Sequence, residues 1–128
     1  FTMCHELSHL SGYMREDEAN FIAFLACIQS DDADFRYSGA FLAMVHASNA
    51  LYSADYALWE QAAALRSDAV ERDIASNNAY WAQYDTPVAE VSNRVNDAYL
   101  KANGQENGVQ SYGRMVDLLL AYYRENAA

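Results

Sequence analysis

Residues 34–52 read DFRYSGAFLAMVHASNALY, and this stretch decides the expected fold. Its apolar side chains fall on nearly every face of a helix, a pattern that only a helix in the centre of a domain tolerates. Residues that favour helix fill the long stretches around it, and the chain has a single proline. We therefore predict an all-α fold, a single compact bundle of about six helices.

The other predicted helices have a helical period of apolar residues and are separated by cap or turn residues. Gly12 suits the C-terminal cap of the first helix, and Thr86-Pro87 suits the start of the fifth. The fourth can break near Asn77 and Asn78. The six helices cover about residues 1–11, 16–29, 34–52, 54–84, 87–103 and 109–125.

Length and charge exclude several classes of protein. The 128 residues fit one domain, 1–128, in which we expect residues 1–30 to carry a metal site and residues 31–128 to form the helical core. The net charge of −10, without a basic stripe, argues against nucleic-acid binding. The apolar runs are shorter than the roughly 20 residues of a membrane span. Because the chain begins with Phe1, we expect a C-terminal fragment of a longer protein.

The segment His5-Glu6-Leu7-Ser8-His9 has the HExxH pattern. Residues four apart share one face of a helix, so His5 and His9 can bind the same ion, and zinc accepts imidazole nitrogen. Glu6 can take a proton from a water molecule whose pKa the ion lowers toward ~7. The pattern predicts one zinc ion and Glu6 as the general base. The alternative is two histidines on a solvated helix face.

A catalytic zinc also needs a third protein ligand. Glu16, Asp17 and Glu18 are the candidates, and on a helix they point about 100° apart. We predict Glu16 as the ligand, with Glu18 as its competitor, because only the face of Glu16 continues through small or polar side chains that allow a close helix approach. These side chains are Asn20, Ala23 and Cys27. Asn20 is then expected to hydrogen-bond a ligand histidine. The alternative is that the acidic run only complements the helix dipole.

Other polar residues give weaker signals. His46 lies in an apolar helix and is expected to be a core histidine. Cys4 and Cys27 can pair or remain thiols, and the sequence requires neither. Tyr112 and Arg114 are candidate oxyanion stabilisers, although no pattern selects either one.

Three stretches carry a resemblance to a known family. They are CHELSHLSGYMREDEANFIAFLACI, FRYSGAFLA and VNDAYLKANGQENGVQSYGRMVDLLLAYY. They resemble a bacterial family of unknown function whose members look like zincin metallopeptidases and carry membrane-spanning helices upstream of the HExxH. The resemblance implies that the parent protein is membrane-anchored and that this chain is its soluble part. The side of the membrane stays open, with the extracytoplasmic side favoured.

Residues 16–20, EDEAN, are also similar to the Glu-x-x-Ala-Asn element of glutamate-type zincins. This resemblance implies that Glu16 is the third ligand and Asn20 its helical neighbour, although the spacing from His9 to Glu16 is short for that group. The stretch HELSHLSGYMR resembles in part the metzincin pattern HExxHxxGxxH. It departs from that pattern at Arg15, because a guanidinium cannot ligate zinc in place of the third histidine.

Two functions follow as hypotheses. The first is a zinc-dependent peptidase domain that acts on a peptide or protein substrate. The second is a helical binding module that keeps a metal site without hydrolysis. Zincins usually hold the substrate backbone on an edge strand before the HExxH helix, by strand pairing, and only four residues precede His5. We therefore expect residues 1–128 alone to have little peptidase activity.

Overall fold

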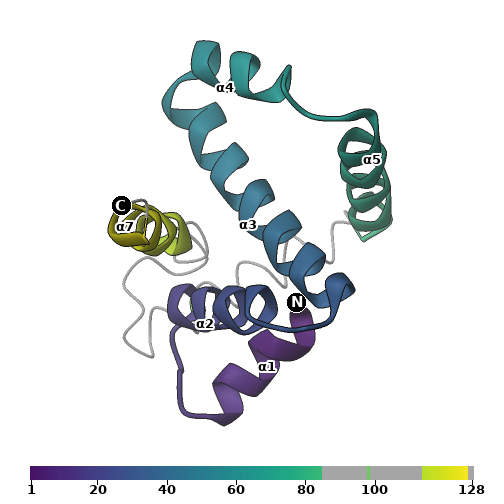
Figure 1. Ribbon diagram of the computed structural model, residues 1–128. Helices are drawn as coiled ribbons and strands as arrows, with labels where there is room; N and C mark the ends of the chain where they lie inside the picture. The colour runs from purple at the N-terminus through teal and green to yellow at the C-terminus, as the bar shows by residue number, and fades with distance from the viewer. Residues whose placement is uncertain (85–97, 99–113, 127–128) are drawn as a thin grey trace. The chain divides into compact units, whose positions relative to one another are not determined.

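The computed structural model describes residues 1–84, 98 and 114–126. Within these residues the chain forms α-helices and no strand, which confirms the predicted all-α class (Figure 1). The helices are α1 (Thr2–Leu10), α2 (Glu16–Ile28), α3 (Ala33–Ala54), α4 (Tyr56–Ala63), α5 (Asp68–Ala82) and α7 (Met115–Asn126). None of these helices combines the length and the hydropathy of a membrane span.

The chain divides into two compact units. The first unit consists of Phe1–Ala54 and Gln110–Ala128, and it contains α1, α2, α3 and α7. The second unit is Asp55–Val109, with α4 and α5. The HExxH helix and the acidic start of α2 both belong to the first unit.

Helix α2 is the centre of the first unit, where it contacts α1, α3 and α7. The prediction that the helix over residues 34–52 is central was wrong, because α3 buries only Gly39 and Ala43. Phe24 is fully buried and forms the core cluster with Ala43 of α3 and with Met115 and Leu119 of α7. The sequence predicted a core within residues 31–128, and α2 shares this core. The cause is that α2 buries two faces, one against α1 and one against α3 and α7, so Phe24 cannot face solvent.

The approach of α3 to α2 depends on Gly39. A Cβ atom at this position would lie 2.5 Å from Cβ of Cys27 and 3.5 Å from the carbonyl oxygen of Phe24. Real Cβ atoms do not pack at the first of these distances, so only glycine allows the two backbones to come this close. Gly39 and Cys27 are both buried.

The turn after α1 is a Schellman motif. The amide of Gly12 donates to the carbonyl of His9 over 3.0 Å, and the amide of Tyr13 donates to the carbonyl of Ser8 over 3.1 Å. Gly12 has a φ of 100°, which explains why glycine stands here. Residues 13–15 then lead to α2, and Arg15 is its N-cap in an extended conformation.

In the second unit, the position of one helix break differs from the prediction. The helix expected over residues 54–84 is broken after Ala63, and its second part starts at Asp68, whereas Asn77 and Asn78 lie within α5. Ser67 caps α5, because its hydroxyl accepts from the amide of Val70. The predicted helix that begins at Thr86-Pro87 lies outside the described residues.

Candidate metal centre

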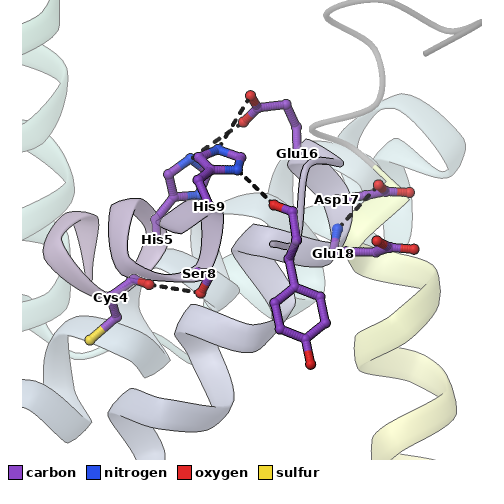
Figure 2. Close-up of polar contacts among 8 residues, drawn as sticks. Cys4, His5, Ser8, His9, Glu16, Asp17 and Glu18 are labelled. Carbon is purple, nitrogen blue, oxygen red and sulfur yellow. Dashed lines mark hydrogen bonds and ion pairs between the residues drawn. The ribbon is translucent and has the colours of Figure 1, made fainter. Parts of the chain in front are cut away.

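Three side chains with metal-binding atoms converge between α1 and α2 (Figure 2). Nε2 of His5 lies 3.1 Å from Nε2 of His9. The carboxylate of Glu16 lies 3.4 Å from Nε2 of His5 and 3.6 Å from Nε2 of His9. The ligand atoms of the three residues all lie within 4.8 Å of one another. The structure therefore brings together the three residues that the sequence nominates as metal ligands.

The backbone of the turn orients the ring of His9. Its Nδ1 lies 2.7 Å from the carbonyl oxygen of Tyr13. A carbonyl oxygen only accepts, so Nδ1 carries the proton and donates, and Nε2 keeps its lone pair for the cluster. Sequence reasoning missed this contact, because a backbone carbonyl has no residue-type signature. The only sequence signal was Gly12, which shapes the turn that presents the carbonyl.

The ring of His5 is held differently. Its Nδ1 is buried and has no hydrogen-bond partner among the described residues. The ring meets that of His9 edge to face, with centroids 4.6 Å apart. Because Nε2 of His9 keeps its lone pair, the proton in the 3.1 Å contact lies on Nε2 of His5, and a cation at that atom would displace it and select the tautomer with the proton on Nδ1.

The acidic residues at the start of α2 have different partners. Arg15 donates to Asp17 over 2.8 and 3.2 Å, and this hydrogen-bonded ion pair lowers the pKa of the Asp17 carboxyl. The carboxylate of Glu18 lies 3.5 Å from Nε of Arg15. Figure 2 shows the Asp17 and Glu18 side chains pointing away from the imidazoles, toward which Glu16 points. Arg15 therefore pairs with the carboxylates of Asp17 and Glu18, whereas the carboxylate of Glu16 faces the two histidines.

The remaining site candidates lie around the cluster or outside the described residues. Glu6 is exposed on α1, beside His5. Asn20 is buried on the same face of α2 as Glu16, and no hydrogen bond joins its amide to either histidine. Arg114 is exposed just before α7 and forms no ion pair with Glu16. Tyr112 lies outside the described residues.

The donor set fits a divalent cation. Two imidazole nitrogens and one carboxylate carry a single negative charge when the histidines are neutral, and such nitrogen and oxygen ligands suit zinc and related metals. The side chains are 14% exposed for His5, 23% for His9 and 14% for Glu16, so the cluster is shielded but still open to solvent. This cluster could therefore hold a metal ion.

Comparison with known proteins places the chain in a family. The model of a family described as "Protein of unknown function (DUF3810)" matches residues 1–120. Neither the search of curated proteins nor the search of solved structures gives a match. The match includes α1 and α2 in full and therefore all the ligand candidates of the cluster. Because it covers nearly the whole sequence, the chain belongs to the DUF3810 family of unknown function.

Proposed function

We propose that this chain is a zinc-dependent metallopeptidase domain in which His5, His9 and Glu16 hold one zinc ion. The observation that carries the proposal is the convergence of two Nε2 atoms and one carboxylate, from an HExxH helix and the helix that follows it. Catalytic zinc sites are built from three protein ligands and one open position. Two histidines and one glutamate are a ligand set of that kind.

The spacing of the donor atoms is compatible with a zinc ion. Ligands at ~2.0–2.2 Å from a tetrahedral ion lie roughly 3.3–3.6 Å from one another. The two nitrogen–oxygen separations, 3.4 and 3.6 Å, lie in that range, and the 3.1 Å between the two Nε2 atoms lies slightly below it. The two nitrogen–oxygen separations exceed the usual range of a direct N–H···O hydrogen bond, about 2.7–3.2 Å. The Glu16 carboxylate is thus at the separation of a co-ligand rather than of a hydrogen-bond partner, whereas the two Nε2 atoms share a hydrogen bond that a bound ion would replace.

Glu6 is the proposed general base. It follows His5 directly on α1, it is exposed, and it is not one of the clustered ligands. A bound zinc ion would lower the pKa of a coordinated water toward ~7 and polarise a substrate carbonyl. Glu6 would accept the proton of that water and later deliver it to the leaving amine. The substrate is proposed to be a peptide or a protein.

Metal analysis and a single substitution test this function. The purified 128-residue chain should contain zinc in a one-to-one ratio, and the ratio should fall when His5 is replaced by alanine. In the full-length protein, Glu6→Gln should retain the zinc and lose hydrolysis of unstructured peptides, because the amide keeps the shape of the side chain but cannot accept the proton.

Two outcomes would overturn the peptidase proposal. One is a chain without stoichiometric zinc after purification in zinc-containing buffer. The other is a full-length protein that binds zinc and cleaves no peptide, a result that would favour a non-catalytic helical module with a structural metal site. Exposed Glu71 of α5 offers a matched control, because Glu71→Gln should change neither zinc content nor turnover.

Membrane anchoring of the parent protein also belongs to the proposal. It is supported by the family resemblance of the HExxH stretch, and the anchor would lie in segments other than those described. Fractionation of cells that express the full-length protein checks this point. Release into the soluble fraction, without detergent, would contradict it.

A further inference from the structure

The two cysteines of the chain meet where α1 contacts α2. Sγ of Cys4 lies 3.7 Å from Sγ of Cys27, and both are free thiols. The residues are 23 positions apart and belong to different helices, so packing of the helices brings the sulfurs together. We propose that Cys4 and Cys27 are a reversible dithiol–disulfide pair that ties α1 covalently to α2.

The surroundings of Cys27 favour this pairing. Cys27 is fully buried, and α3 closes on it from another side, where a Cβ at Gly39 would lie 2.5 Å from its own Cβ. The close approach of α3 therefore leaves little free space around Cys27. A disulfide needs an S–S distance of about 2.05 Å, so the sulfurs must approach from 3.7 Å by side-chain rotation. Figure 2 shows the Cys4 side chain pointing away from the imidazoles, so the bond would leave both rings in place.

The two thiols have different access to solvent, which sets the order of reaction with a small disulfide such as glutathione disulfide. Cys4 is only partly buried, so its thiolate attacks first. The glutathione S–S bond breaks, and one glutathione leaves as a thiol with the proton that Cys4 gave up. The sulfur of Cys27 then attacks the Cys4 sulfur of the mixed disulfide, and the second glutathione leaves with the proton of Cys27. Two protein thiols are oxidised and one glutathione disulfide is reduced.

This inference goes beyond the proposed function and stands apart from it. The bond would restrict the motion of the helix that carries His5 and His9 relative to the helix that carries Glu16. Its formation, however, requires neither a bound metal nor turnover. A failure of the peptidase proposal would therefore leave the redox pair standing, and the reverse also holds.

Mass spectrometry and thermal unfolding test the pair. The folded 128-residue chain is incubated with glutathione disulfide, treated with iodoacetamide and compared with a reduced sample. We expect a monomer that has lost the mass of two hydrogen atoms and takes up no alkyl group. Cleavage after Arg15 and Arg36 should leave the Cys4 and Cys27 peptides joined. The loop-closure effect of such a bond predicts a melting temperature about 10 °C above that of the reduced chain.

Single variants provide the controls. Cys27→Ala should leave Cys4 as a lasting glutathione adduct, whereas Cys4→Ala should leave Cys27 unmodified in the folded protein because it is buried. Neither variant should show the redox-dependent shift in melting temperature. The proposal is overturned by disulfide-linked dimers, by a lasting glutathione adduct on Cys4 of the unsubstituted chain, or by two thiols that remain reduced.

Discussion

The ring of His9 donates through Nδ1 to the carbonyl oxygen of Tyr13, four residues further along the chain, over 2.7 Å. The carbonyl is presented by the Schellman turn that Gly12 makes possible. The cap of α1 thus has two roles, because it ends the helix and sets the tautomer of a candidate metal ligand. This coupling leads to a prediction about Gly12.

Gly12→Ala should weaken both the fold and the metal site. The φ of 100° suits glycine, and a Cβ there costs about 1–2 kcal/mol. The strained turn would displace the Tyr13 carbonyl, so zinc affinity should fall by roughly 10- to 100-fold, as for loss of an outer-shell partner. Urea unfolding and competition with a fluorescent chelator measure the two effects. Ser11→Ala, at an ordinary φ of −83°, is the matched control. Equal zinc affinities of the Gly12→Ala and Ser11→Ala variants would contradict the role of the turn in orienting His9.

Glu16→Ala and Glu18→Ala should differ sharply in zinc affinity. The Glu16 carboxylate lies 3.4 Å from His5, whereas Glu18 lies 3.5 Å from Arg15. Loss of Glu16 should reduce affinity by more than the ~10- to 100-fold that loss of an outer-shell partner causes. Glu18→Ala should change it little, since exposed ion pairs contribute only ~0–1 kcal/mol to stability. Zinc titration of both variants checks the order, and the reverse order would mean that Glu18 is the ligand.

Gly39→Ala should destabilise the first unit, although alanine is the better helix former by about 1 kcal/mol. The new Cβ would meet Cβ of Cys27 at 2.5 Å, and overpacking of this kind costs ~1–3 kcal/mol. The control is the exposed neighbour, where Ala40→Gly should cost about 1 kcal/mol through helix propensity alone. Thermal unfolding compares the two. A Gly39→Ala variant more stable than the parent would show that α2 and α3 can separate without cost.

His46 should make the fold sensitive to mild acid. Burial lowers its pKa below the ordinary value of 6.5, since the charged form is poorly solvated within the first unit. Above that value both the folded and the unfolded chain hold His46 neutral. Below it the unfolded chain binds the proton more readily, so stability falls as the pH drops toward and through the folded pKa.

The His46→Leu variant measures this contribution. Its free energy of unfolding should fall less than that of the parent between about pH 7.5 and about pH 5.5. Urea titrations with a chelator present remove any effect of metal release. The same acid-induced loss in both proteins would assign the pH dependence to other groups.

The sequence predicted the helical start of the chain well. HExxH fixed a shared face for His5 and His9, and the small side chains after Glu16 indicated which face of α2 approaches them. Both predictions depend only on the helical period of 3.6 residues, and α1 and α2 pack through the faces that this period indicates. The break before Asp68 was missed, because the cap residue Ser67 is a weaker signal in a sequence than the pair Asn77 and Asn78.

Tertiary contacts explain what the sequence could not predict. The packing of α7 on α2, which buries Phe24 against Met115 and Leu119, was not predicted because it has no local signature. The proximity of Cys4 and Cys27 depends on the rotation of two helices about their axes. The contact of His9 with the Tyr13 carbonyl could not be predicted either, because every residue type has a backbone carbonyl. Each of these features follows from where backbones meet, which composition and spacing do not specify.

All three clustered ligands come from residues 5–16, on either side of one short turn. Closing so short a loop has a small entropic cost, and contacts between near neighbours in the chain form quickly during folding. An ion captured by this hairpin would join α1 to α2 before α3 and α7 are packed against them. A bound metal would then act as a local cross-link that adds to the stability of the first unit, beside the packing of α2 against α3 and α7.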